Sequence, residues 1–290
     1  MQMMKTLKIL KHLNRPLINQ NSFSNKLFEG SKMESINRTM STVDPKEIAH
    51  HSKMKSFWWE ENSGIRLLHL FGPLRAQFIK DGLANAGIKL ENPALPLEGL
   101  KIADIGCGGG ILTERLARMG AYVTGVDAAT ELIDIAKEHV KLDSTISEKV
   151  NYIQASIEEF SPKNEKLYDA VIAFEVVEHV ENVDIFLKEC VKILKPGGSI
   201  FITTINKTLI SWLGAIIIAE CVLNLIPRGT HTWNKFISPY EVQYILDKYG
   251  CKTKLIRGIK FNPVTNQFSW SSLTAIHYGL HAVKQRETKI

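Results

Sequence analysis

Between residues 100 and 206 the chain alternates short apolar runs with segments of helical periodicity. The apolar runs predict five strands, which are LKIADIG, AYVTGVD, KVNYIQAS, YDAVIAF and SIFITTIN. Helices are predicted in the segments TERLARMG, ELIDIAKEHVKL and VDIFLKECVKIL. Apolar strands that alternate with helices are typical of a parallel sheet that is covered on both faces. The pattern therefore predicts an α/β fold.

Helices and strands are also predicted on both sides of this region. An aromatic cluster at residues 57–59 precedes a helix that is expected over residues 73–86. Another helix is predicted in SPYEVQYILDKYG, where Ser238 and Glu241 form a capping box. Two late strand candidates, KTKLIRGI and TAIHYGLHAV, have no helix between them. They predict an antiparallel hairpin at the sheet edge, with His277 and His281 on the polar face of the second strand.

The stretch LISWLGAIIIAECVLNLIP, within the insertion of residues 209–237, is apolar almost all round. Single-pass insertion into a membrane is not favoured, because the stretch contains Glu220 and is shorter than the roughly 20 residues of a typical span. Three interpretations stay open: a core helix, a lid over an apolar substrate, or a helix in the plane of a membrane surface.

Composition and charge narrow the class of protein. The chain has 290 residues, of which 44% are hydrophobic and 23% charged, as in ordinary globular proteins. Its formal net charge is +6, but residues 1–43 hold seven basic and two acidic residues, so the remainder is nearly neutral. A nucleic-acid-binding domain would carry its basic excess in the folded part, so no nucleic-acid partner is expected.

Residues 1–43 have the composition of a mitochondrial transit peptide. No acid precedes Glu29, and Leu7, Leu10 and Leu13 fall close to one helical stripe with lysines beside it. A secretory signal would need an apolar core that this segment lacks. The leader is therefore predicted as a transit peptide, with a disordered basic tail as the alternative, and residues 44–290 as a single domain.

A glycine-rich loop, IADIGCGGG, joins the first predicted strand to the first helix. Glycines at 106 and 108–110 allow a ligand to approach the backbone closely. The dinucleotide fingerprint G-x-G-x-x-G fails, because its third glycine would fall on Ile111. Asp127 ends the second strand about 20 residues later, where a carboxylate can accept both ribose hydroxyls. A nucleoside ligand without a pyrophosphate is expected, and a tight glycine turn beside a surface Asp is the alternative.

Asp104, these glycines, Asp127 and the turn LKPGG resemble the class I S-adenosylmethionine (SAM) methyltransferases. The resemblance implies a Rossmann-like fold with a mostly parallel seven-stranded sheet and a C-terminal antiparallel hairpin. N-terminal helices and an inserted apolar helix would complete the domain. It also implies SAM as the ligand of the glycine loop.

Several longer segments resemble the ubiquinone-biosynthesis O-methyltransferases over residues 45–283. These segments are FWW, RLLHLFGPLR, GCGGGIL, EVVEHV, RGTHTWNKFISP and FNPVTNQF. The resemblance implies methyl transfer to a catechol hydroxyl of polyprenyl-dihydroxybenzoate and demethylubiquinol. It assigns SAM contacts to a set of six residues, with Phe174 as a backbone or van der Waals contact only. The set comprises Arg75, Asp104, Gly106, Gly108, Asp127 and Phe174.

The stretch AFEVVEHV carries three side chains that can bind a metal, Glu175, Glu178 and His179. The resemblance implies that they hold Mg²⁺, which would stabilise the phenolate of the acceptor. If a helix begins at the end of the fourth strand, their spacing places all three on one face. Two Glu and one His would equally suit Mn, Fe or Zn. The alternative is a helix start that favours acids, with His179 only capping or packing. Glu178 and His179 are also the predicted catalytic residues, and without a metal His179 would be the general base.

The resemblance also implies partners and a location. These are a prenylated catechol lipid as substrate, the matrix side of the mitochondrial inner membrane, and a multi-subunit biosynthetic complex. The insertion at 209–237 is then expected to be an acceptor lid that contacts the membrane. A SAM-dependent enzyme with a small soluble phenolic acceptor and a non-catalytic scaffold subunit are the alternatives.

Overall fold

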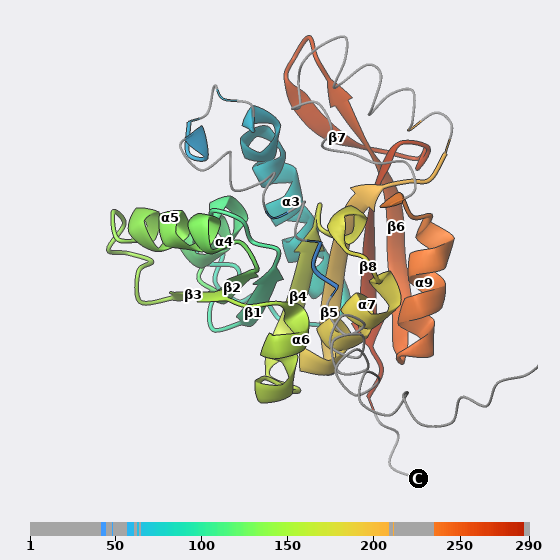
Figure 1. Cartoon of the computed structure of the whole chain (residues 1–290), viewed down its shortest axis with the longest axis horizontal. Coiled ribbons are helices and arrows are strands. Elements are labelled where there is room, and N and C mark those ends of the chain that lie inside the picture. The colour runs from blue at the N-terminus through green and yellow to red at the C-terminus, as the bar shows by residue number, and fades with distance from the viewer. Residues whose placement is uncertain are drawn as a thin grey trace, which may run out of the picture. The chain divides into compact units, whose positions relative to one another are not determined.

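The computed structural model describes residues 42–44, 48, 57–60, 63, 65–208, 211 and 235–286 of the 290-residue chain (Figure 1). The chain divides into two units, Met1–Met40 and Ser41–Ile290. Nearly all of the predicted transit peptide and most of the predicted insertion at 209–237 lie outside the described residues.

One sheet organises the described part of the chain, in the order β3-β2-β1-β4-β5-β8-β6-β7. Its first five positions pair in parallel, and β8, β6 and β7 are added antiparallel. The predicted α/β fold with a mostly parallel sheet is confirmed. The strands are β1 (Lys101–Ile105), β2 (Tyr122–Asp127), β3 (Val150–Gln154), β4 (Tyr168–Phe174), β5 (Leu194–Ile205), β6 (Cys251–Asn262), β7 (Gln267–Ser271) and β8 (His277–Lys284).

The antiparallel end of the sheet differs from the prediction in one strand. The two late strands do pair antiparallel, as β6 and β8, but β7 adds an eighth strand where seven were expected. A tight turn creates it: the Asn262 side chain accepts hydrogen bonds from the backbone N–H of Val264 and Thr265, and Asn266 adopts a left-handed φ of 53°. The sequence prediction had taken this stretch only as a motif.

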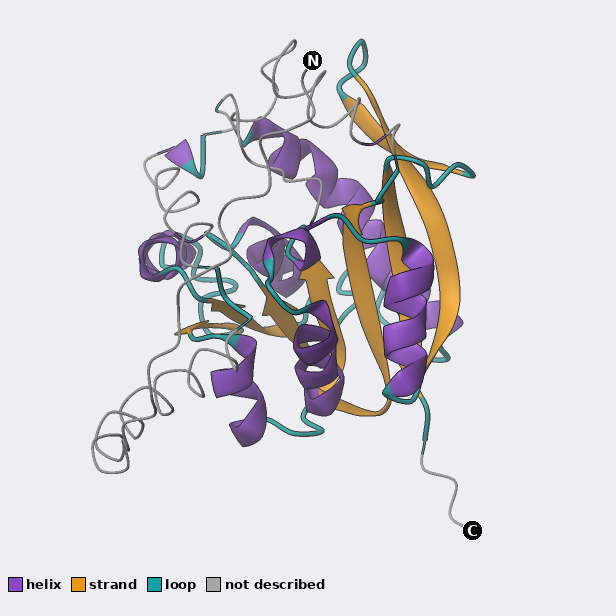
Figure 2. Ribbon diagram, turned by 45° about the vertical axis from the view of Figure 1, so that its right-hand side comes forward, coloured by secondary structure: helices purple, strands orange, loops and turns teal. Residues whose placement is uncertain are grey.

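Helices cover both faces of the sheet (Figure 2). The predicted start of the first helix at Pro73 is wrong, because α3 begins at Arg66 and continues through the proline. Buried Phe71 and Ile79 hold this helix against the domain, which compensates for the hydrogen bond that Pro73 cannot make. The helices are α3 (Arg66–Asn85), α4 (Ile111–Arg118), α5 (Thr130–Val140), α6 (Ile157–Phe160), α7 (Val183–Ile193) and α9 (Pro239–Lys248), with the 3₁₀ turns η2 (Ser161–Lys163) and η3 (Val177–His179).

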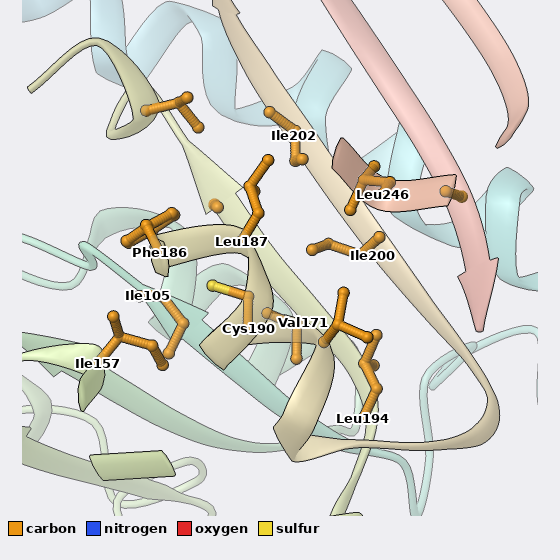
Figure 3. Close-up of a cluster of buried hydrophobic side chains, with 14 of the residues drawn as sticks. Ile105, Ile157, Val171, Phe186, Leu187, Cys190, Leu194, Ile200, Ile202 and Leu246 are labelled. Atoms are coloured by element: carbon orange, nitrogen blue, oxygen red, sulfur yellow. The ribbon is translucent and has the colours of Figure 1, made fainter. Parts of the chain in front are cut away.

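The protein has two hydrophobic cores, one on each face of the sheet, because successive side chains of the central strands point to opposite faces. On β4, Val171 and Ala173 face a core with α6, α7 and α9, whereas Ile172 and Phe174 face a core with α3, α4 and α5. Figure 3 shows the first core, in which Leu187 of α7 and Leu246 of α9 pack near the sheet. Burial on both faces explains why these strands read as continuous apolar runs in the sequence.

The capping box predicted for α9 is present. The Ser238 hydroxyl accepts from the Glu241 backbone N–H at 3.3 Å, and the Glu241 carboxylate accepts from the Ser238 N–H at 2.9 Å. These bonds fix the start of α9 directly after residues 235–237. None of the described helices is long and apolar enough to cross a membrane.

A short segment near the start of the second unit packs beside the chain that follows β4. Val43 forms an isolated bridge with Val180, and the Thr42 carbonyl accepts from the Glu181 N–H at 2.9 Å. Lys235 and Asp44 form an ion pair of 2.6 Å. The segment 42–44 therefore connects the loop after β4 with the residues that lead into α9.

Candidate active site

The predicted SAM residues and the predicted metal residues lie at one edge of the sheet. The glycine loop follows β1, Asp127 ends β2, and Glu175 follows β4. These three strands are neighbours, since β1 pairs with β2 on one side and β4 on the other. The carboxyl ends of parallel strands are where ligands bind in open α/β sheets.

The glycine loop presents bare backbone at this edge. Gly106 and Gly108 have φ values of 74° and 55°, which L side chains rarely adopt. The Gly106 N–H donates to the Val126 carbonyl at 2.8 Å, which ties the loop to β2. The Gly108 N–H donates to the Asp127 carboxylate at 2.9 Å. A backbone without side chains allows a ligand to lie against the loop, as the sequence predicted.

Asp127 joins the glycine loop to the next helix. One carboxylate oxygen accepts from Gly108, and the other accepts from the Ala129 N–H at 2.8 Å, directly before α5. The side chain is therefore held at the end of β2, where the predicted contact with ribose hydroxyls requires it.

Asp104 lies behind the loop and is only 3% exposed. Its carboxylate accepts a hydrogen bond from the Thr113 hydroxyl at 2.6 Å. This bond connects β1 to α4, the helix that follows the glycine loop. Burial raises the pKa of Asp104 to about 6, although the Thr113 hydrogen bond and the charge of Arg75 act in the opposite direction.

Arg75 reaches the same edge from α3 and is buried, with an exposed fraction of 6%. Its guanidinium carbon lies 4.1 Å from the centre of the Phe71 ring and 5.6 Å from that of Phe174. Arg75 Nη2 is 3.2 Å from Glu175 Oε1, so the two groups form an ion pair. Their geometry is not that of a hydrogen bond, and Nη2 has no hydrogen-bond partner. Arg75 Nε also lacks a hydrogen-bond partner. Unpaired N–H groups on a buried cation fit an anionic ligand group such as the SAM carboxylate.

Three groups contact the same carboxylate oxygen of Glu175, Oε1. Besides Arg75, Oε1 accepts from the Thr203 hydroxyl at 2.6 Å and lies 2.8 Å from His277 Nε2. Burial would raise the pKa of Glu175, but His277, Arg75 and Thr203 together hold it well below its usual range. Glu175 is therefore an ionised carboxylate at the centre of a cluster from α3, β4, β5 and β8.

The helix predicted at the end of β4 is not formed. The three predicted metal ligands therefore do not share one helical face. Glu175 adopts a left-handed φ of 54°, and only Val177–His179 turns, as the 3₁₀ segment η3. A left-handed residue breaks the i, i+3 and i, i+4 geometry that would have placed the three side chains on one helical face.

Glu178 is buried and only partly satisfied. Its exposed fraction is 2%, and Oε2 accepts from the Thr204 hydroxyl at 2.7 Å, whereas Oε1 has no hydrogen-bond partner. Burial, with the neighbouring charge of Glu175, raises the pKa of Glu178 to about 8. His179 is half-buried, and its backbone N–H donates to the Val176 carbonyl at 2.9 Å.

The arrangement does not fit the predicted Mg²⁺ site. In the part of the chain that the structure describes, no group of three or more His, Cys, Asp or Glu side chains is placed to hold a metal ion. Glu175 instead neutralises Arg75 and contacts His277. The metal-ligand set Glu175, Glu178 and His179 is therefore not supported.

Two histidines that the sequence placed on the polar face of a strand lie inside the protein. His277 contacts Glu175, and His281 is 1% exposed, stacked on Phe201 and 3.1 Å from the Ser199 hydroxyl. The prediction was wrong because helices cover both faces of β8. Tyr278 and Leu280 pack in the core that contains α9, whereas His281 faces α3, where a Cβ atom on Gly82 would lie 3.2 Å from its Nδ1. No sequence signal marks His277, since the position of β8 is set by pairing at long range.

Two motifs of the family resemblance meet at the site. Phe268 of FNPVTNQF stacks on Phe71 of RLLHLFGPLR with ring centres 4.4 Å apart. At the start of the same helix, Arg66 Nη1 donates to the Asn266 side chain at 3.1 Å. The β6–β7 hairpin is thereby fixed against the helix that carries Arg75.

Several solved structures with similar folds are named as methyltransferases. A magnesium protoporphyrin IX methyltransferase from Synechocystis with bound SAM superposes with a TM-score of 0.53 and 15% identity, over 90% of this chain and 100% of that one. A putative sarcosine dimethylglycine methyltransferase from Galdieria sulphuraria gives a TM-score of 0.52 at 15% identity, over 73% of this chain and 86% of that one. These likenesses confirm the Rossmann-like methyltransferase fold.

Sequence comparison is more specific. The family model described as a methyltransferase domain matches residues 103–202. The mitochondrial ubiquinone biosynthesis O-methyltransferase of Rattus norvegicus is 40% identical over 256 residues, which cover 88% of this chain and 74% of the rat protein. The ubiquinone biosynthesis O-methyltransferase of Pelagibacter ubique is 39% identical over 82% of this chain and 97% of its own length. Because identity at this level extends over most of both proteins, the chain belongs to the SAM-dependent ubiquinone biosynthesis O-methyltransferase family.

Proposed function

We propose that the protein transfers the methyl group of SAM to a catechol hydroxyl of polyprenyl-dihydroxybenzoate and of demethylubiquinol. The contact between RLLHLFGPLR and FNPVTNQF carries the proposal. It places two family-like segments beside the Arg75–Glu175 pair, at the carboxyl ends of the strands that hold the glycine loop.

Each SAM-binding residue has a distinct part in this proposal. The Asp127 carboxylate accepts hydrogen bonds from the ribose hydroxyls. Gly106 and Gly108 have no side chains, so the ligand can approach the backbone of the loop. Arg75 pairs with the carboxylate of the methionine moiety, because it is a buried cation whose Nε and Nη2 lack hydrogen-bond partners. Phe174 contributes a van der Waals surface only. Bound SAM supplies an electrophilic methyl group on a sulfonium.

The acceptor hydroxyl must lose its proton before or during methyl transfer, because a neutral phenol is a poor nucleophile. We assign the proton transfer to Glu178 and His179. The unpaired Oε1 and the raised pKa of Glu178 support this, since a general base works best with a pKa near the working pH. The proton passes to the base, the phenolate oxygen bonds to the methyl carbon, and the bond from that carbon to sulfur breaks.

The geometry of the described residues does not support Mg²⁺ bound by Glu175, Glu178 and His179. Glu175 has a different part in the proposed mechanism. Its negative charge balances that of Arg75 and holds the guanidinium in place, because the two groups form an ion pair of 3.2 Å.

Location and partners follow from the same family membership. We infer that the protein works in mitochondria, since the animal relatives and that of Dictyostelium discoideum are named as mitochondrial and residues 1–43 are basic. On the matrix side of the inner membrane it would act on a prenylated catechol lipid, within a multi-subunit complex. The insertion at 209–237 would serve as a lid that contacts the membrane, because its stretch of residues 209–227 is apolar almost all round.

The decisive experiment is methyl transfer from labelled SAM to a short-chain prenyl catechol by residues 41–290, which keep the contacts of Thr42 and Val43 with Glu181 and Val180. The protein is treated with EDTA, and Mg²⁺, Mn²⁺ or Zn²⁺ is then added back singly. Glu178→Gln and Glu181→Gln are assayed in parallel, the second as a matched control from the exposed part of the same segment. We expect activity to persist in EDTA and to fall about 100-fold or more in Glu178→Gln only.

Other outcomes would contradict parts of the proposal. Activity that EDTA abolishes and one ion restores would return Glu175, Glu178 and His179 to a metal site. Turnover of a small soluble phenol but of no prenyl catechol would contradict the acceptor. If the protein binds SAM but methylates no catechol, the alternative of a non-catalytic scaffold subunit would be supported.

A further inference from the structure

Trp58 lies directly on the glycine loop. A Cβ atom placed on Gly108 would be 2.5 Å from Trp58 Cζ2, and one placed on Gly109 would be 2.3 Å from Cδ1. Such distances mean that the indole ring touches the loop backbone where a side chain would otherwise stand. The ring is only 5% exposed, so it covers the loop from solvent.

The indole N–H of Trp58 has no hydrogen-bond partner, although it is buried. A buried Trp N–H ordinarily finds an acceptor, because leaving it unpaired costs free energy. This donor is next to the glycine loop: a Cβ atom on Gly109 would lie 2.6 Å from Trp58 Nε1. An unsatisfied donor beside a ligand-binding loop indicates an acceptor atom on the ligand.

The backbone around Trp58 is fixed by contacts that do not involve its own ring. The Trp58 carbonyl lies 3.0 Å from His69 Nε2 of α3. Trp59 stacks on His139 of α5 with ring centres 3.4 Å apart, and His139 Nδ1 is 2.8 Å from the buried Glu114 carboxylate of α4. The segment is therefore attached to three helices around the site, which fixes the Trp58 backbone and leaves its ring free of these contacts.

Trp58 also contacts the element that follows Asp127. It belongs to a small hydrophobic cluster with Ala129 and Leu132, at the start of α5. The ring thus lies between the glycine loop and the helix start to which Asp127 is bonded. Both elements belong to the SAM site, so a ligand that contacts the loop and Asp127 lies next to this ring.

We propose that Trp58 is a SAM-binding residue that closes over the cofactor. When SAM binds, the indole ring moves from the glycine backbone onto the ligand, and its N–H donates to an oxygen atom of SAM. The inference rests on SAM binding at this loop, and the identity of the methyl acceptor does not affect it. It adds a residue from the segment before α3 to the site formed by the strand ends.

The test measures binding of S-adenosylhomocysteine, the demethylated product, by calorimetry without acceptor or metal. Trp58→Phe keeps an aromatic ring and removes the N–H, and Trp58→Tyr is a second variant in case the first does not fold. Trp59→Phe is the matched control, since the Trp59 N–H is also buried and unpaired but its ring stacks on His139. Circular dichroism and the melting temperature establish that each variant is folded.

We expect Trp58→Phe to raise the Kd about 5- to 10-fold, and Trp59→Phe to change it less than twofold. The ligand should alter tryptophan fluorescence in the parent and in Trp59→Phe, and much less in Trp58→Phe. Unchanged affinity together with an unchanged fluorescence response in a folded Trp58 variant would overturn the proposal and leave the ring as a structural cover. No binding to the parent protein would instead refute the SAM site itself, whereas binding without catechol methylation would contradict only the proposed acceptor.

Discussion

His277 Nε2 lies 2.8 Å from Glu175 Oε1, although the two residues are 102 positions apart in the chain. The strand β8 brings the histidine to the glutamate by pairing with β5, where His277 is opposite Ile205. The same carboxylate oxygen holds the buried Arg75. The charge balance at the centre of the site therefore depends on a strand from the end of the domain.

The first prediction concerns this contact and is tested by a double-mutant cycle. His277→Ala and Glu175→Gln are each expected to lower the free energy of unfolding, and Glu175→Gln more strongly, because it leaves Arg75 buried without its counter-charge. The expected losses are about 1–3 kcal/mol for His277→Ala and about 3–5 kcal/mol for Glu175→Gln. The two effects should be non-additive by about 1 kcal/mol or more. Urea unfolding of all four proteins measures this, and strictly additive losses would show that the contact contributes nothing.

Gly108 provides a second prediction, with Gly87 as its control. Both have a positive φ, 55° and 92°, so Ala at either position should cost about 1–2 kcal/mol in stability. A Cβ on Gly87 meets nothing within 4 Å, whereas one on Gly108 would overlap the Trp58 ring at the ligand-binding loop. Calorimetry should therefore show an affinity for S-adenosylhomocysteine at least tenfold lower in Gly108→Ala and unchanged in Gly87→Ala. Equal affinities in the two variants would contradict the role of the bare backbone.

Arg75 provides a third prediction. Arg75→Met keeps most of the side-chain volume and removes the charged N–H groups, so affinity for S-adenosylhomocysteine should fall about 10- to 100-fold. Arg75→Lys should recover only part of it, because an ammonium group cannot reproduce the geometry of a guanidinium. Arg66→Met on the same helix is the control, since Arg66 bonds to Asn266 and not to Glu175. Binding by Arg75→Met equal to that by Arg66→Met would exclude Arg75 from the cofactor site.

The fourth prediction is a pH dependence that originates at His281. Burial, followed by the charge of Lys254, lowers the pKa of His281 from 6.5 to about 4. Between these values the unfolded chain binds a proton that the folded chain does not, so stability is lost as the pH falls from 6.5 towards 4. The contribution is fully present above pH 6.5.

His281→Phe tests this, because it keeps a ring against Phe201 and cannot titrate. From pH 7 to pH 4.5 the parent protein should lose about 2 kcal/mol more stability than His281→Phe. Comparing the slopes removes the contribution of Asp104, whose raised pKa acts in the opposite direction in both proteins. Parallel stability curves in urea unfolding at pH 7, 5.5 and 4.5 would show that His281 is not the titrating group.

Local signals in the sequence determined most of the fold. Apolar runs between helical segments predicted the strands β1 to β5, because strands buried on both faces must be apolar throughout. The capping box at Ser238 and Glu241 predicted the start of α9, since both of its hydrogen bonds are made within four residues. The glycine loop and Asp127 were predicted for the same reason, because each lies at the end of a strand that the pattern had already marked.

Only the tertiary structure decided what surrounds Glu175. The sequence spacing of Glu175, Glu178 and His179 suggested one helical face, but a left-handed backbone at Glu175 and the short η3 separate their directions. The partners of Glu175 come from α3, β5 and β8, and no periodicity within one segment can indicate pairings across 100 residues of chain. A sequence pattern indicates which side chains of one helix or strand are buried. Side-chain contacts between distant elements depend instead on strand order and register.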